Sequence, residues 1–218
     1  MATASTSCTA GRRWRGLLAV ALLVVQTGGV AQPGAAATRP RRTPSIATYA
    51  KVRVRSPAGV PRLVGFHEAS SRGARRMRPS GRLIANHNGK YRPPRRSVGA
   101  SYRVMPSRRR GTPATSAVDV AMRSTAPVRS AVTGRVSYVG GYRLYGRHRD
   151  MIVVIVPRRR PSLRVVMLHI RDVRVRPGQR VAAGRTRVAT RARRLPFTSQ
   201  IDTWTGRAPH VHIEVRRS

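Results

Sequence analysis

Short apolar runs rich in valine, with glycine and proline punctuating the sequence between them, constrain this chain most. No stretch of it shows a competing helical period over a long window. Branched side chains such as valine pack well on a pleated surface, so these runs predict β-strands. The clearest runs cover residues 117–122, 127–132, 134–139, 151–156, 163–170, 180–181, 187–188 and 210–215. Many short strands with turn residues between them predict an all-β fold, an antiparallel β-sandwich or open barrel.

The organisation before residue 111 is less regular. Three arginines and an apolar run precede small residues at positions 35–37, which is typical of an export signal over residues 1–37. The only cysteine, Cys8, lies in that signal, so the mature chain is expected to contain no thiol. Residues 38–45 form an Arg/Pro-rich linker, and residues 46–110 an irregular extension with short strands near 62–67 and 81–85. Residues 111–218 form the main domain. We therefore expect a secreted protein of the cell envelope without a transmembrane span in its mature form.

The charge is extreme, because 45 basic residues, almost all arginine, face only 6 acidic ones, for a formal net charge of +39. Such a chain attracts polyanions, including anionic polymers of the cell envelope. The arginines are scattered through strands and loops rather than gathered in one tail. No interleaving of aromatic and basic residues indicates a base-stacking surface, so no specific nucleic-acid partner is expected.

Histidines and one carboxylate supply the candidate chemistry. In His210-Val211-His212, the period of two places both imidazoles on one face of a strand. Asp119 lies inside an apolar run, and His169 ends another. A buried carboxylate needs a partner, because an unpaired buried charge is costly. Each of these residues has an alternative interpretation as an ordinary polar residue near a strand end.

Four sequence blocks in a fixed order give these residues a context. They are A-P-V-R-S-A-V-T-G-R-V at 126–136, L-H-I at 168–170, V-R-P-G-Q-R-V-A-A-G at 175–184 and T-G-R-A-P-H-V-H-I-E-V at 205–215. Residues 111–216 thereby resemble the lysostaphin/LytM-type zinc endopeptidases, which cleave peptide cross-links of bacterial peptidoglycan. The resemblance implies the all-β fold of that family, zinc as cofactor and peptidoglycan, or another anionic envelope polymer, as partner.

The same resemblance assigns roles residue by residue. It implies that Asp119 and His212 bind zinc, and that His169 and His210 are catalytic residues that handle protons or stabilise an oxyanion. One position departs from the family pattern, because Thr115 stands where a zinc-binding histidine is expected. Two ligands alone would hold zinc loosely, since catalytic zinc sites keep three protein ligands.

Three interpretations of this departure remain open. In the first, the domain is a degenerate relative that binds cell wall or regulates another wall hydrolase. In the second, His67 or His87 from the N-terminal extension replaces the missing ligand and zinc-activated hydrolysis of wall peptides is retained; His148 is a lesser candidate. In the third, another metal or none is used. For each of these histidines the alternative is a solvated loop residue. A secreted polyanion binder is a further function class, which follows from the charge alone.

Overall fold

The computed structural model describes residues 42–94 and 98–218. The predicted export signal and half of the predicted linker, residues 38–41, lie outside these residues. No helix in the described part of the chain has the length and apolar character that crossing a bilayer requires.

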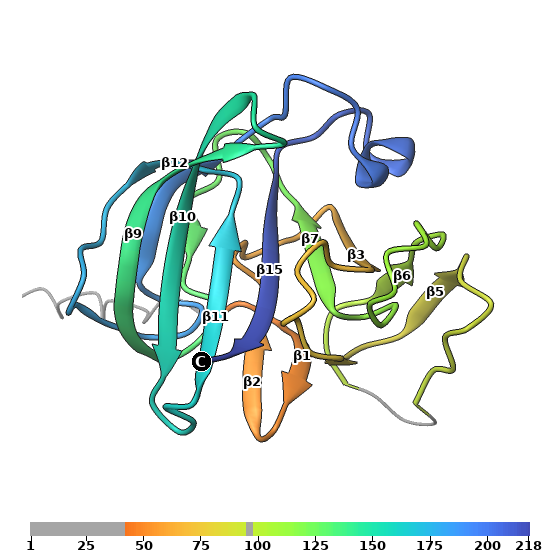
Figure 1. Ribbon diagram of the computed structural model, residues 1–218, viewed down its shortest axis with the longest axis horizontal. Coiled ribbons are helices and arrows are strands. Elements are labelled where there is room, and N and C mark those ends of the chain that lie inside the picture. The colour runs from red at the N-terminus through yellow and green to blue at the C-terminus, as the bar shows by residue number, and fades with distance from the viewer. Residues whose placement is uncertain (1–41, 95–97) are drawn as a thin grey trace, which may run out of the picture. The chain divides into compact units, whose positions relative to one another are not determined.

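A nine-stranded sheet organises the described residues (Figure 1). Its strand order is β13-β9-β10-β11-β15-β7-β3-β6-β5. All neighbours pair antiparallel except β6, which pairs parallel with both β3 and β5. The strands are β3 (Leu63–His67), β5 (Leu83–Asn86), β6 (Tyr102–Val104), β7 (Ala117–Ala121), β9 (Gly134–Leu144), β10 (His148–Pro157), β11 (Leu163–Leu168), β13 (Arg180–Val181) and β15 (His210–Arg217).

Two three-stranded sheets complete the fold. One has the order β2-β1-β4 and the other β12-β14-β8. Their strands are β1 (Ser45–Tyr49), β2 (Val52–Arg55), β4 (Arg78–Pro79), β8 (Val128–Arg129), β12 (Ile170–Val173) and β14 (Arg187–Ala192). The only helix among the described residues is the short 3₁₀ helix η1 (Gln200–Trp204).

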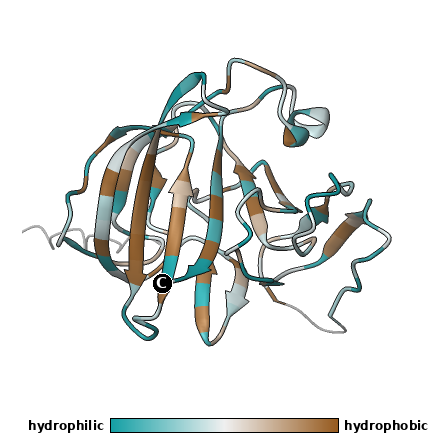
Figure 2. Cartoon of the chain, viewed as in Figure 1, coloured by the Kyte–Doolittle hydropathy of each residue, from teal (hydrophilic) through white to brown (hydrophobic). Residues whose placement is uncertain are grey.

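The core consists mainly of aliphatic side chains, because only 5% of the residues are aromatic. Val118, Val120, Ile155 and Ile213 are fully buried in one continuous cluster that also contains residues of both smaller sheets. Apolar residues fill much of β10, as the brown colour in Figure 2 shows. Removing this surface from water stabilises the fold by roughly 25 cal/mol per Å² of apolar area.

These observations confirm the predicted all-β class, with sheets that are almost entirely antiparallel. Individual strands differ from their predicted ranges. The run at 163–170 is interrupted at His169, which has a left-handed backbone conformation with φ 61°, so β11 ends and β12 begins there. The run at 127–132 forms only the two-residue strand β8.

The segment 46–110 is more integrated than an irregular extension. Strands β3, β5 and β6 extend the main sheet beyond β7, and β1 packs Ile46 and Ala47 into the shared core. Residues 42–110 therefore contribute directly to the surface that β7 and β15 present. The division into an extension and a main domain at residue 111 stays a prediction.

Candidate metal centre

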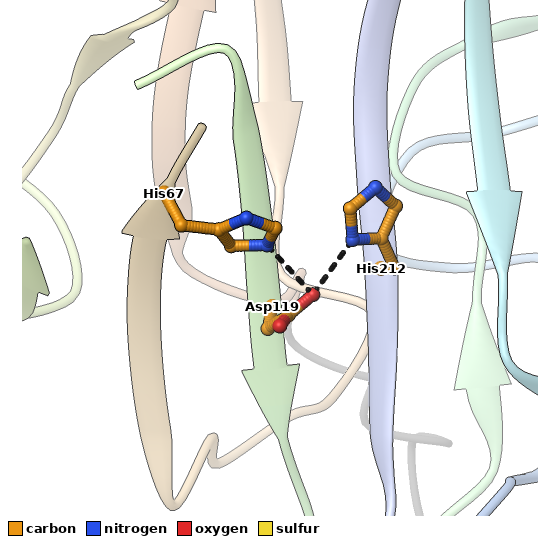
Figure 3. A group of neighbouring side chains, drawn as sticks. All are labelled: His67, Asp119 and His212. Carbon is orange, nitrogen blue, oxygen red and sulfur yellow. Dashed lines mark hydrogen bonds and ion pairs between the residues drawn. The ribbon is translucent and has the colours of Figure 1, made fainter. Parts of the chain in front are cut away.

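Three neighbouring strands bring one carboxylate and two histidines together (Figure 3). Asp119 lies in the central strand β7, directly opposite His212 of β15. On its other side Asp119 pairs with Gly65 of β3, and His67 lies two residues further along that strand. Side chains two residues apart share one face of a sheet, and directly opposite side chains are close neighbours. The pairing register thus places all three side chains on the same face.

The distances within this group are those of a compact ligand set. His212 Nδ1 lies 2.8 Å from Asp119 Oδ1, and His67 Nε2 lies 3.2 Å from the same oxygen. One ligand atom from each residue lies within 4.8 Å of the other two. His67 Nε2 is buried and has no geometrically sound hydrogen bond. Two imidazole nitrogens and a carboxylate oxygen are a donor set typical of zinc, so the residues fit this metal.

The remaining ring nitrogen of each histidine is held by an oxygen acceptor. His67 Nδ1 donates to the backbone carbonyl of Glu68 at 2.9 Å, and His212 Nε2 donates to Glu214 Oε1 at 2.9 Å. Such contacts fix the tautomer and orientation of metal-binding imidazoles in proteins. His67 Nε2 and His212 Nδ1 are consequently the nitrogens that face Asp119.

The charges in this group stabilise one another. Burial raises the pKa of Asp119, but His67, His210 and His212 outweigh burial and hold that pKa well below its usual range. Burial lowers the pKa of His212, but hydrogen bonds to Asp119 and Glu214 raise it to about 10 overall. The chain alone therefore pairs an ionised carboxylate with a His212 ring that readily carries positive charge. A metal ion that binds His212 Nδ1 takes the place of the proton on that nitrogen, so metal binding releases a proton.

A second pair of histidines flanks the first group. His210 lies on β15 two residues before His212, and its ring centroid lies 5.2 Å from that of His169. Burial lowers the pKa of His210, and the nearby His169 and His212 lower it further. Asp119 raises this pKa, but the pKa stays below its usual value overall. His210 is therefore neutral at neutral pH. Its Nδ1 is buried without a hydrogen-bond partner among the described residues.

His169 is oriented by a buried carboxylate. Its Nδ1 lies 2.5 Å from Asp150 Oδ2, which also accepts a hydrogen bond of 2.7 Å from the hydroxyl of Tyr142. Arg193 lies 3.5 Å from the other oxygen of Asp150. Burial raises the pKa of Asp150, but its hydrogen bonds, above all that from His169, lower it overall. An ionised Asp150 only accepts, so Nδ1 of His169 donates and its Nε2 is left available for chemistry.

One cleft of about 410 Å³ is lined by Asp119 and the four histidines, His67, His169, His210 and His212. Its other walls come from the β9–β10 hairpin, the segment 195–200 and the segment 108–110. Across its mouth, Tyr145 of the hairpin tip contacts Phe197, with ring centroids 5.5 Å apart. The arrangement combines a candidate cation site, a neutral imidazole and an oriented imidazole within one accessible concavity.

Comparison with known proteins assigns this region to a family. The model of peptidase family M23 matches residues 114–218. This region of the chain belongs to peptidase family M23. The predicted lysostaphin/LytM-type resemblance is thereby confirmed, and with it membership of a zinc-dependent family of the peptidoglycan-hydrolase type.

Solved structures resemble the chain over part of its length. The solution structure of lysostaphin shares 20% identity over 47% of this chain and 36% of that chain, with a TM-score of 0.34. A zinc-containing peptidase from Vibrio cholerae shares 24% identity over 46% of this chain and 26% of its own, with a TM-score of 0.32. The catalytic domain of a mutant of EnpA, a prophage-encoded M23 protein from Enterococcus faecalis, shares 18% identity over 62% and 88%, also with a TM-score of 0.32.

The chain spans about a third of the length of lysostaphin and about a quarter of that of the Vibrio cholerae peptidase. No curated protein matches the chain.

The structure separates the three histidines that the sequence offered as replacements. His67 lies beside Asp119, whereas His87 stacks on Trp204 with ring centroids 5.2 Å apart. His148 packs against Phe197, with ring centroids 5.3 Å apart. Only His67 joins the group of possible metal ligands found among the described residues.

Thr115, which stands where the resemblance predicts a zinc-binding histidine, makes a structural contact instead. It is 1% exposed, and its hydroxyl donates a 2.6 Å hydrogen bond to the carbonyl of Met77. The Met77 amide in turn donates to the carbonyl of Thr115 at 3.0 Å. Thr115 thus ties the segment before β4 to the start of β7 within the M23 region.

Sequence reasoning missed the residues that hold His169. Asp150, Tyr142 and Arg193 received no role, although an acidic residue at the start of the apolar run 151–156 was a usable signal in a chain with so few carboxylates. Their contacts link β9, β10 and the segment after β14, which no local sequence pattern brings together.

Proposed function

We propose that this chain is a secreted zinc-dependent endopeptidase that hydrolyses peptide bonds of bacterial peptidoglycan, with His67, Asp119 and His212 as the metal ligands. One observation carries the proposal: the three donor atoms converge within 4.8 Å from three neighbouring strands. Membership of the M23 family gives that convergence a function.

The fit of the residues to zinc rests on their own contacts. The buried and unsatisfied His67 Nε2 points at the same carboxylate oxygen as His212 Nδ1. The opposite nitrogens are engaged by oxygen acceptors, as is usual for zinc-bound histidines. When bound, zinc polarises carbonyl groups and makes a water nucleophile available near neutral pH.

His210 and His169 are the proposed proton-handling residues. His210 is buried and neutral, so it is able to accept a proton and return it to a leaving amine. His169 presents Nε2 while Asp150 and Tyr142 hold its opposite side, which limits rotation of the ring. A positioned imidazole of this kind contributes typically about 10²–10⁴-fold to a reaction rate.

The alternative function is a degenerate M23 domain that binds cell wall, or regulates another wall hydrolase, without catalysis. The specific observation in its favour is Thr115. Its buried hydroxyl donates a hydrogen bond to the carbonyl of Met77 and does not join the proposed metal ligands. Both functions place the protein at the cell envelope, in keeping with the export signal that the sequence predicts.

Zinc content and hydrolysis of purified sacculi together test the proposal. The mature chain, purified with zinc present, is expected to retain one equivalent of zinc, to release soluble peptides from sacculi and to lose this activity on chelation. His210→Ala should keep zinc but lose hydrolysis, and His148→Ala is the matched control that should keep both. A zinc-free wild-type protein after this purification would refute the metallopeptidase and leave the binding function.

A further inference from the structure

A second concavity of about 590 Å³ lies apart from the cleft. The β1–β2 hairpin, the turn between β10 and β11, and the segments 132–133 and 182–183 form its walls. Its volume falls within the range of about 300–1,000 Å³ that is usual for ligand sites.

This concavity is much more cationic than the rest of the chain. Six of its twelve lining residues are basic, whereas basic residues make up about a fifth of the whole chain, and its lining contains no carboxylate. The cleft, by contrast, has four arginines among twenty-one lining residues. The basic residues are Arg42, Lys51, Arg53, Arg55, Arg158 and Arg159. None of these six forms an ion pair with any described residue.

The packing holds these cations close together. Arg160 Nε donates a 3.0 Å hydrogen bond to the carbonyl of Ala50, which ties the β10–β11 turn to the tip of the β1–β2 hairpin. Arg55, which is partly buried, donates to the carbonyl of Thr43. Behind it, Gly184 has φ 69°, and a Cβ there would lie 2.6 Å from Thr43 Oγ1. The concavity is thus built by fixed backbone contacts.

The basic side chains of this concavity lie close enough to repel one another when no ligand is bound. Burial lowers the pKa of Arg55, and the nearby Arg42 and Arg53 lower it further. Like charges held together repel one another, so an anion that enters the concavity relieves this repulsion.

The chemistry of the lining selects among anions. Guanidinium groups match phosphate oxygens through paired hydrogen bonds, and Arg53, Arg158 and Arg159 supply exposed guanidinium groups. The lining contains no aromatic side chain on which a base would stack. A chain of phosphodiesters without bases fits these features better than a nucleic acid does.

The concavity and the cleft lie at opposite ends of the β9–β10 ribbon. Leu144 and Tyr145, at one end, line the cleft, whereas Pro157, at the other end of β10, lines the basic concavity. Ten residues of strand span about 30 Å. A polymer held at one end therefore leaves the cleft free for a peptide.

We infer that this basic concavity binds the phosphate groups of a phosphodiester polymer of the cell envelope. Binding there would keep the protein on the wall while the separate cleft acts. The site goes beyond the proposed hydrolysis and is independent of zinc.

Calorimetric titration of the mature protein with a short glycerol-phosphate oligomer tests the inference. The variant Arg53→Gln/Arg158→Gln/Arg159→Gln should lose at least about tenfold in affinity, and its dependence of log affinity on log salt should fall by roughly 2. The control Arg62→Gln/Arg82→Gln/Arg123→Gln removes the same charge from exposed arginines outside both concavities. It should lose less than about twofold.

Other outcomes overturn the inference. Equal losses in both triple variants would show that the net charge, and not this concavity, binds the oligomer. Tighter binding of a single-stranded oligonucleotide with the same number of phosphates would assign the site to nucleic acid. Inorganic phosphate that binds as tightly as the oligomer would exclude a polymer. Thermal unfolding and zinc content of both variants should match those of the wild type, which keeps this test separate from that of the cleft.

Discussion

The region that matches family M23 and the region that precedes it contribute to one site in different ways. Strands β7 and β15, inside the matched region, carry Asp119 and His212, whereas β3, outside it, carries His67. Thr115, where the resemblance predicts a zinc-binding histidine, donates a hydrogen bond to the carbonyl of Met77. Under the proposed function, the missing ligand is supplied from a neighbouring strand, whose pairing register brings His67 to the same face as Asp119 and His212.

The largest expected effect is that of removing His67. His67→Ala leaves Asp119 and His212 as the only proposed ligands, so zinc should be lost on dialysis and hydrolysis of sacculi should fall by at least about 10³-fold. Elemental analysis and a sacculus-release assay measure the two effects. His87→Ala is the matched control, because His87 stacks on Trp204 away from the ligand group. Unchanged zinc in His67→Ala would break the proposed link between the two regions.

Removing the metal should lower the thermal stability of the chain, most of all in the strand β3 that precedes the M23 region. At a zinc concentration about 100–1,000 times Kd, bound metal stabilises the folded chain by about 3–4 kcal/mol, which corresponds to roughly 10 °C in Tm. Thermal unfolding with and without a chelator measures this difference in the wild type. In His67→Ala the chelator should change Tm little. Hydrogen exchange should show the largest loss of protection in β3, because zinc would cross-link that strand to β7 and β15.

The sequence predicted the all-β fold class, which the structure confirms, and it named C-terminal candidate residues, but it left the replacement ligand open between His67 and His87. The strand period of two placed His210 and His212 on one face, and the resemblance carried by the four ordered blocks implied the roles of Asp119 and His169. The choice between His67 and His87 depends on which strands pair across about fifty residues. Local patterns do not specify such pairing, since either histidine ends or follows a plausible strand. The carboxylate behind His169 was missed for the same reason.

A smaller effect is expected within the M23 region itself. Asp150→Asn keeps the shape of the side chain but weakens its hold on the His169 ring. Loss of such an orienting partner typically costs about 10–100-fold in activity. The loss should appear in kcat, with zinc content unchanged, because Asp150 is not among the proposed ligands. Asp172→Asn, at an exposed carboxylate, is the control. Loss of zinc in Asp150→Asn would show that metal binding by His67 and His212 depends on how the His169 ring is held.

Acid should remove the contribution of ionised Asp150 to the free energy of unfolding. The folded pKa of Asp150 is lowered below its unfolded value of 3.8, so its stabilising contribution is fully present above about pH 4. It is lost as the pH falls through the lowered pKa. The difference in unfolding free energy between wild type and Asp150→Asn should therefore shrink as the pH falls below about 4. Urea unfolding from pH 3 to 7 measures it, and a constant difference would contradict the assignment.

The smallest effect is expected at Thr115, which lies within the M23 region and contacts the segment before β4. Thr115→Val removes the buried hydroxyl that bonds to Met77 while keeping the side-chain volume, and it should cost about 1 kcal/mol in unfolding free energy. Zinc content and hydrolysis should not change, since His67 is the proposed ligand in place of this residue. Urea unfolding and elemental analysis of the same preparation check both statements. A loss of zinc in Thr115→Val would mean that the family position still supports the metal, and that β3 has only partly replaced it.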